Sequence, residues 1–179
     1  MTEISNAVGT LDALISSASG GLREDVFLLV SRLLPLVNVD LLVQDESGRT
    51  LLTWRDDEFY GPGWHVPGGI IRFQEPLADR IRKTAKIELG TDVEFAPEPI
   101  AVRESIDPKR QSRGHFVSLL YRCTLLGPPA AELQYRKGVP AAGQWSWHAV
   151  CPPDMIDVHR HYAEFIDTVA RNGACECQA

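Results

Sequence analysis

The chain has 179 residues, with 18 basic and 24 acidic side chains and a formal net charge of -6. This length suits one domain with a substantial core. The negative charge argues against bulk attraction to nucleic acid or to an anionic membrane surface. No run of about 18 apolar residues is present, so we expect no membrane-spanning segment. The first residues carry neither the basic nor the apolar block of a signal peptide, so we expect a cytoplasmic protein.

The cysteine content fits that compartment. Cys123, Cys151, Cys175 and Cys177 are expected to be reduced thiols. No further Cys or His pair completes a metal site with the Cys-x-Cys pair, so we interpret residues 174–179 as a tail without a site. The sequence thus predicts an N-terminal extension at 1–21, a main domain at 22–173 and this tail.

The first half of the chain predicts two helices and two strands. Thr10 is expected to cap a short helix that stops at residues 19–21. Apolar residues at helical spacing predict a second helix over 23–34, before a proline. Branched residues then predict buried strands at 37–43 and 50–54, joined by a turn.

The second half continues to alternate between strands and helices, which indicates an α/β protein. A helix is predicted from Glu75 to Gly90, and a closing helix from an Asp154 cap to Gly173. The elements between them are short strands at 92–95 and 100–104, a basic loop at 105–114, a central strand at 116–125, a long loop at 126–143 and a last strand at 144–150.

Residues 64–91 are the most informative stretch. A short strand from Trp64 runs into Pro67-Gly68-Gly69, and a helix follows that ends at Gly90. A strand, a glycine loop and a helix bring free backbone groups and helix side chains together. This arrangement is typical of sites for charged ligands.

The spacing of this stretch resembles the Nudix box, whose full form ends Arg-Glu-aliphatic-x-Glu-Glu-x-Gly-aliphatic. Lys83 stands for the arginine, while Thr84 and Ile87 stand where the family has glutamates. Positions 84, 87 and 88 share one helix face, where a full box gathers carboxylates for divalent metal. Only Glu88 remains here.

This loss is similar to the shortened box of the GDP-mannose mannosyl hydrolase branch of the Nudix family, and the likeness extends over most of residues 22–125. The resemblance implies a Nudix-type α/β/α sandwich with a mixed sheet. It also implies a nucleoside diphosphate sugar as substrate, cleaved at the sugar carbon to release GDP and free sugar. A homodimer is the oligomeric state that it favours.

The resemblance further implies one Mg²⁺, held by Glu88 and by the carbonyl oxygen of Gly68, which stabilises the departing diphosphate. Arg55 matches a substrate arginine and Asp40 a substrate-side aspartate. The branch's second arginine falls on a non-arginine position here. Arg72 lies two residues further along and would share its face on a strand.

Two positions of the branch are not matched. Its glutamine ligand and its histidine base align with Ala141 and Ala142. Gln144 becomes the ligand if the loop shifts by a few residues. For the base, His115, His148 and Glu104 stay open, because water attacking a sugar carbon needs a group that titrates near working pH.

Other readings remain open. The chain could cleave the pyrophosphate of another nucleoside diphosphate derivative, or it could bind a nucleotide sugar without turning it over, which the two alanines favour. We interpret Glu75 as pairing with a basic helix residue. Lys109, Arg110 and Arg113 are interpreted as a solvated loop, with a phosphate clamp as the alternative.

Overall fold

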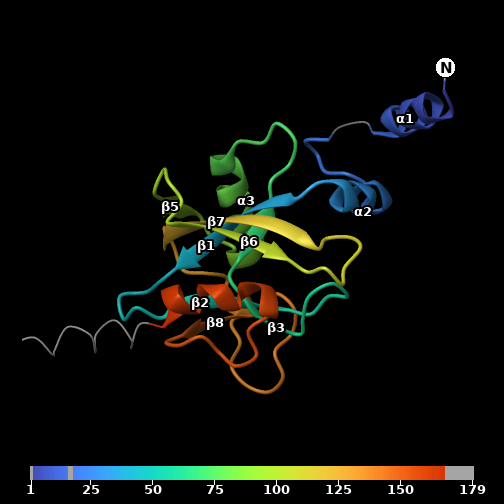
Figure 1. The fold of residues 1–179 in the computed structure, drawn as a ribbon. Coiled ribbons are helices and arrows are strands. Elements are labelled where there is room, and N and C mark those ends of the chain that lie inside the picture. The colour runs from blue at the N-terminus through green and yellow to red at the C-terminus, as the bar shows by residue number, and fades with distance from the viewer. Residues whose placement is uncertain (1, 16–17, 168–179) are drawn as a thin grey trace, which may run out of the picture.

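The computed structural model describes residues 2–15 and 18–167 (Figure 1). Its larger sheet has the order β4-β1-β7-β5, and β6 also pairs with β7. Strands β1 and β7 are parallel and the other pairings are antiparallel, so the sheet is mixed. The strands are β1 (Leu36–Val43), β4 (Gly68–Ile70), β5 (Val93–Phe95), β6 (Ala101–Ile106) and β7 (His115–Leu125).

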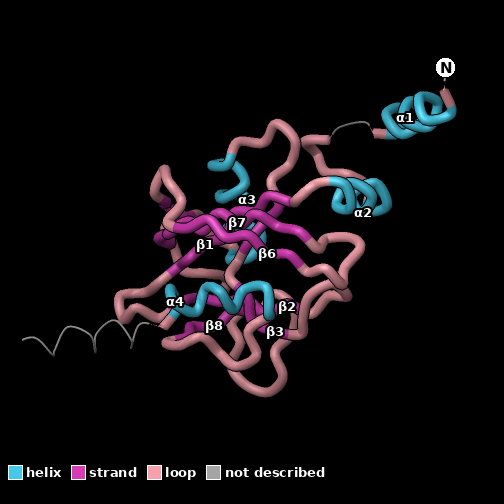
Figure 2. The backbone as a smooth tube through the Cα atoms, in the orientation of Figure 1, coloured by secondary structure: helices cyan, strands magenta, loops and turns pink. Residues whose placement is uncertain are grey.

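A second, antiparallel sheet has the order β3-β2-β8. It consists of β2 (Thr50–Arg55), β3 (Gly63–His65) and β8 (Trp145–His148). The helical segments, coloured cyan in Figure 2, are α1 (Glu3–Leu14), α2 (Glu24–Leu33), α3 (Leu77–Leu89), the short 3-10 turns η1 (Ala131–Leu133) and η2 (Asp157–Tyr162), and α4 (Ala163–Ile166). The mixed sheet with its helices confirms the predicted α/β class.

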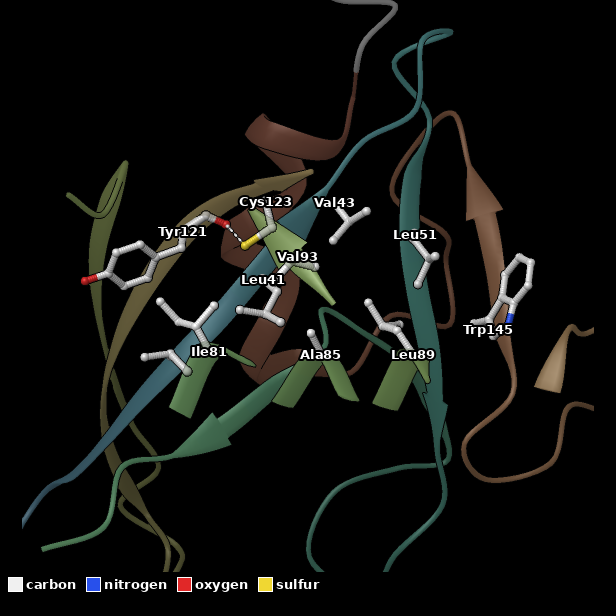
Figure 3. Close-up of a cluster of buried hydrophobic side chains, with 11 residues drawn as sticks. Leu41, Val43, Leu51, Ile81, Ala85, Leu89, Val93, Tyr121, Cys123 and Trp145 are labelled. Atoms are coloured by element: carbon white, nitrogen blue, oxygen red, sulfur yellow. Dashed lines mark hydrogen bonds between the residues drawn. The ribbon is translucent and has the colours of Figure 1, made fainter. Parts of the chain in front are cut away.

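Helix α3 packs on one face of β1. Its apolar residues Ile81, Ala85 and Leu89 recur at helical spacing and are fully buried against Leu41 and Val43 (Figure 3). Each fully buried leucine or isoleucine contributes roughly 1.5–3 kcal/mol relative to an exposed one. This packing fixes the orientation of α3 and therefore of the polar residues beside the stripe.

The other face of β1 is also buried. Leu42 joins a second cluster that contains Leu52, Trp64, Tyr162 and Ile166, from the smaller sheet and the C-terminal segment. Burial on both faces explains why β1 is a nearly continuous apolar run instead of an alternating one.

Two predicted helix boundaries are wrong. Helix α1 begins at Glu3 with Thr2 as its N-cap, while Thr10 lies inside the helix and donates to the carbonyl of Asn6. Asp154 does not cap a helix, because its carbonyl accepts the N–H of Trp64 at 3.0 Å. The chain turns at Pro153 and Asp154 and bridges to β3 at Met155, so helical structure begins only at Asp157. The predicted end of the closing helix at Gly173 lies outside the described residues.

None of the helices within residues 2–15 and 18–167 is long and apolar enough to cross a bilayer.

Cys123 is buried and Cys151 is half-buried, and both are unpaired thiols. Burial raises the pKa of the Cys123 thiol to about 12, so it is protonated and unreactive at neutral pH. The predicted Cys-x-Cys tail falls outside the described residues.

Candidate active site

A cavity of about 520 Å³ lies against the larger sheet. Alternate residues of β1 face it, because successive side chains of a strand point to opposite faces. The cavity is lined by residues from both sheets, from α2, α3 and η2, and from the segments that precede α2, α3 and β7. Of the residues predicted to form the site, Asp40, Arg55, Gly68 and Arg72 line it.

Glu88 lies on α3 next to the buried stripe and points toward both sheets. Its Oε2 accepts the hydroxyl of Thr53 at 2.9 Å and lies 3.4 Å from Nε2 of His65. Its Oε1 accepts the backbone N–H of Gly68 at 3.2 Å. The carboxylate is therefore held against the glycine loop by three elements.

The backbone of Gly68 faces the same place. Leu41 donates to the Pro67 carbonyl and Ile71 donates to the Val37 carbonyl, so the β1–β4 ladder is hydrogen-bonded at these residues. Because such pairs alternate along an antiparallel ladder, Gly68 directs its N–H and its carbonyl away from β1. The hydrogen bond from its N–H to Glu88 agrees with this geometry.

Only glycine fits at positions 68 and 69. A Cβ at Gly68 would lie 2.2 Å from Oδ1 of Asp40, and one at Gly69 would lie 2.4 Å from Oγ1 of Thr84. The double glycine therefore lets β4 pass between Asp40 on one face and α3 on the other. This close approach is the physical reason for the Pro-Gly-Gly lead-in.

Asp40 is buried at the floor of the cavity, 1% exposed. Burial raises the pKa of this carboxyl to about 6, against the opposing effects of hydrogen bonds from Tyr162 and Ser118. The Tyr162 hydroxyl donates to Oδ2 at 2.7 Å. These partners fix the carboxyl in place beside Gly68.

Glu75 organises the loop that leads into α3. Its carboxylate accepts from Nε of Arg80 at 2.7 Å, from Nζ of Lys83 at 2.8 Å and from the N–H of Arg72 at 3.1 Å. Burial alone would raise the pKa of Glu75, but these three donors outweigh it and lower the pKa to about 2. The predicted pairing of Glu75 with basic residues of the helix is present.

Arg55 ends β2 and faces the cavity. Its guanidinium pairs with Asp57 and lies 5.4 Å from the centre of the Tyr60 ring. Tyr60 and Arg55 both line the cavity. The arginine is thus positioned two residues along β2 from Thr53, which contacts Glu88.

Arg72 lines the cavity, but its guanidinium donates to the carbonyl of Gly20. Ala18, Gly21 and Leu22, from the same N-terminal segment, also line the cavity. Arg72 therefore holds this segment against the site. The residues just before α2 contribute a wall of the cavity, across the boundary predicted at residue 22.

His115 and Gln144 are not among the residues that line the cavity. Nε2 of His115 lies 3.0 Å from Oε1 of Glu104, at a half-exposed position. Oε1 of Gln144 accepts the N–H of Ala141 at 2.9 Å within the loop before β8. Glu88 is not among the lining residues either, and the hydrogen bonds of His115 and Gln144 go to partners other than Glu88.

Sequence reasoning missed two histidines at the site. His65 lines the cavity and lies 3.4 Å from Glu88, and the ring centre of His159 of η2, which also lines the cavity, lies 5.9 Å from that of His65. Burial is the main reason that the pKa of His159 lies well below its ordinary value, and the neighbouring His65 and His161 lower it further. Its Nδ1 accepts the N–H of Val66 at 3.1 Å, so a neutral ring ties η2 to the glycine loop. The position of His65, two residues before Pro67, was the available signal.

The donor atoms fit a hard divalent cation. Glu88 offers carboxylate oxygen and Gly68 a carbonyl oxygen, both of which suit Mg²⁺. The two positions where a full box has further glutamates provide no carboxylate ligand: Thr84 is buried behind Gly69, and Ile87 is 73% exposed. Within the described residues, no group of three or more His, Cys, Asp or Glu side chains is arranged to hold a metal ion. Glu88 and Gly68 are thus the two oxygen donors that would hold such an ion.

Comparison with known proteins identifies the family and the fold. A family profile described as NUDIX domain matches residues 34–167. The low-salt glycan biosynthesis protein Agl8 of Haloferax volcanii is 44% identical over 59 residues, which make up 33% of this chain and 37% of that protein. The match thus spans little more than a third of that relative.

Solved structures agree on the fold. The MutT NUDIX hydrolase of Burkholderia pseudomallei has a TM-score of 0.57 at 23% identity, over 74% of this chain and 98% of that one. A UDP-X diphosphatase has a TM-score of 0.55 at 14% identity, over 97% of this chain and 73% of that one. At these identities the likeness concerns the fold alone.

Proposed function

Because the chain belongs to the Nudix family, whose profile matches residues 34–167, we propose that it is a magnesium-dependent hydrolase of nucleoside diphosphate sugars. By resemblance to the GDP-mannose mannosyl hydrolase branch, it releases a nucleoside diphosphate and the free sugar. The observation that carries the proposal is the placement of Glu88 and Gly68 together, beside a cavity lined by Arg55 and Asp40.

Glu88 and the Gly68 carbonyl would hold the ion. When bound, Mg²⁺ neutralises charge that develops on the departing diphosphate. Arg55 adds positive charge on the same side of the cavity, and its pairing with Asp57 limits the side chain's freedom before a ligand arrives. Asp40, held by Tyr162, supplies a fixed carboxyl for sugar hydroxyls at the cavity floor.

The loss of two box glutamates supports attack at the sugar carbon over attack at phosphorus. Thr84 and Ile87 cannot act as metal ligands of the kind that a full box provides. The name of Agl8, a glycan biosynthesis protein, also agrees with a sugar-containing substrate. A cytoplasmic homodimer is the setting that we propose for this activity.

A second candidate is a Nudix-fold module that binds a nucleotide sugar without turnover. It is favoured by Ala141 and Ala142, which are exposed at the positions of the branch's ligand and base. His115 and Gln144 do not replace them at the cavity. Tight binding of a nucleotide sugar without product would favour this module.

The test is Glu88→Gln, which keeps the size of the side chain and removes its charge. We expect magnesium-dependent turnover to fall by at least about a hundredfold, because a metal-binding carboxylate is lost. Glu94→Gln, at an exposed position of β5, is the matched control and should keep full turnover. Unchanged turnover in Glu88→Gln would remove Glu88 from the metal site.

A further inference from the structure

Resting on the proposed function, we propose that Arg113 forms a second anion site in the cavity and that the sugar of the substrate carries a carboxylate that binds there, as in a nucleoside diphosphate uronic acid. Arg113 lines the cavity and is half-buried, whereas the sequence predicted a solvated loop at this position. This site would bind the sugar, while the metal site at Glu88 and Gly68 would bind the diphosphate.

The position of Arg113 is fixed by its surroundings. The backbone is left-handed there, with φ of 53°, and is held by two hydrogen bonds: its N–H donates to Ser31 Oγ at 3.1 Å, and its carbonyl accepts the Tyr60 hydroxyl at 2.5 Å. The guanidinium lies 4.3 Å from the centre of the Phe59 ring and 5.7 Å from that of Phe27. The side chain is therefore held against an aromatic wall before any ligand binds.

The charge of Arg113 has no counterion in the protein. Arg55 pairs with Asp57 and Arg110 pairs with Asp107, but no carboxylate in the described part of the chain forms an ion pair with Arg113. Its Nε is also buried without a hydrogen-bond partner among the described residues. A half-buried cation of this kind is stabilised by an anion from the ligand.

The neighbouring charges point to the same conclusion. Burial is the main reason that the pKa of Arg113 lies below its ordinary value, and Arg55 and Arg110 lower it further, while Asp57 opposes them. The loop thus concentrates positive charge at one wall of the cavity in a chain whose net charge is -6. A neutral ligand group would leave this repulsion in place, whereas an anion removes it.

The strand register separates this wall from the metal end. On β1, Asp40 pairs with Gly68 and Leu36 pairs with Phe116. Four residues of a strand span about 13 Å, and Arg113 lies just before β7, at the Phe116 end of that span. A diphosphate held beside Gly68 therefore lies toward the other end of the floor, and the group at Arg113 belongs to another part of the ligand.

The floor between the two ends suits a sugar. Asn38 and Asp40 both line the cavity and lie two residues apart on β1, or about 7 Å, a span that one sugar ring with its hydroxyl groups can bridge. Oδ1 of Asn38 is buried and has no hydrogen-bond partner among the described residues. A sugar hydroxyl can donate to it, whereas phosphate oxygens are acceptors. A sugar bound here directs its far substituent toward Arg113.

A carboxylate is the substituent that fits a guanidinium best. The planar fork of arginine matches the two oxygens of a carboxylate, and both groups are charged. The hydroxymethyl group of an ordinary hexose offers one oxygen and no charge. A uronic acid has a carboxylate in place of that hydroxymethyl group, so it meets the requirements of Arg113 and Asn38 together.

The experiment is equilibrium binding of matched ligand pairs to the full chain by calorimetry. The sugar pairs are UDP-glucuronate with UDP-glucose and GDP-mannuronate with GDP-mannose. Within a pair the base and the diphosphate are identical, so the ratio of the two affinities reports the carboxylate. A third pair, ADP-ribose 2′-phosphate with ADP-ribose, carries its extra anion on the nucleoside.

We expect the acidic member of at least one sugar pair to bind about tenfold or more tightly than its neutral partner, because a hydrogen-bonded charge pair in a buried site has that effect. The ADP-ribose pair should show no such preference. A chelator prevents turnover during the titrations. They are repeated with Mg²⁺, where product analysis also detects cleavage.

Three variants locate the effect. Arg113→Met should weaken binding of the acidic sugar about tenfold and leave that of its neutral partner unchanged, so the preference disappears. Asn38→Ala should weaken both members by the same factor, because both carry the hydroxyl groups. Arg110→Met is the matched control: Arg110 also ties this loop, through Asp107 and the Phe59 carbonyl, but does not line the cavity. It should keep the preference, and melting temperatures verify that each variant is folded.

Each outcome decides the question. Equal affinities within both sugar pairs would overturn the acidic sugar while leaving nucleotide sugar binding, and with it the proposed function, intact. A preference found only in the ADP-ribose pair would place the anion on the nucleoside and would also overturn it. An equal loss for both members of a sugar pair in Arg113→Met would make Arg113 a diphosphate ligand or a structural residue, with the same result. If no nucleotide sugar binds or is cleaved even with Mg²⁺, the proposed function fails together with the inference.

Discussion

The strongest prediction about stability concerns Glu75. Its side chain is 4% exposed and its carboxylate pairs with Arg80 at 2.6 Å and with Lys83 at 2.8 Å. The pKa falls from its ordinary 4.5 to about 2 in the folded protein. Since one pKa unit corresponds to about 1.4 kcal/mol, the ionised carboxylate contributes about 3 kcal/mol to the free energy of unfolding.

The sign follows from the direction of the shift. A depressed carboxyl pKa stabilises the folded state fully above pH 4.5, and this contribution is lost as pH falls toward 2. Glu75→Gln should therefore lose about 3 kcal/mol at pH 7, or about 6–12 °C in Tm for a chain of this size. The difference between variant and wild type should shrink steadily below pH 4.5.

Urea unfolding at pH 7 and at pH 3 measures both effects. Asp79→Asn is the matched control, because Asp79 pairs with Arg82 at 3.6 Å while both side chains are more than half exposed. That variant should change stability by less than about 0.5 kcal/mol. A loss below about 1 kcal/mol for Glu75→Gln at pH 7, or an equal loss at both pH values, would refute the reasoning.

Three further predictions concern the cavity walls. Gly69→Ala should lower Tm, because its Cβ would lie 2.4 Å from Oγ1 of Thr84, and adding Thr84→Ala should restore part of the loss. Burial raises the pKa of Asp40 from 3.8 to about 6, so its ionisation lowers the stability of the folded state as pH rises through this range. The Tm of Asp40→Asn should therefore rise relative to that of the wild type between pH 4 and pH 7. An unchanged difference in Tm would contradict the raised pKa of Asp40. Arg72→Met should speed limited proteolysis within residues 18–22, since the hydrogen bond that holds this segment is lost; an unchanged rate would argue against that role.

Most of the fold could be predicted from local patterns. The stripe of Ile81, Ala85 and Leu89 and the terminating Gly90 placed α3 to within two residues, because apolar spacing and a left-handed C-cap are local signals. The strand at 37–43 was equally plain, since burial on both faces leaves an apolar run. The start of the closing helix was predicted wrongly because Asp154 is tied to Trp64, a contact between distant parts of the chain.

The site could be predicted only where the family resemblance carries it, as for Asp40 and Arg55, which line the cavity. Glu88 and Gly68 come from the resemblance to the box, and in the structure the Gly68 N–H donates to Glu88. The one local signal for His65 is its position two residues before Pro67, and its place beside Glu88 depends on strand register. Arg113 could not be told from a solvated arginine, since only the packing of its loop on α2 turns it toward the cavity.

The most direct measurement is identification of the products formed from a panel of nucleotide sugars, GDP-mannose included, with Mg²⁺ and with a chelator as control. Our account predicts a nucleoside diphosphate and free sugar, formed only with the metal. A nucleoside monophosphate and a sugar phosphate would contradict it by showing attack at phosphorus. Binding of a nucleotide sugar without any product would contradict it in favour of the non-catalytic module.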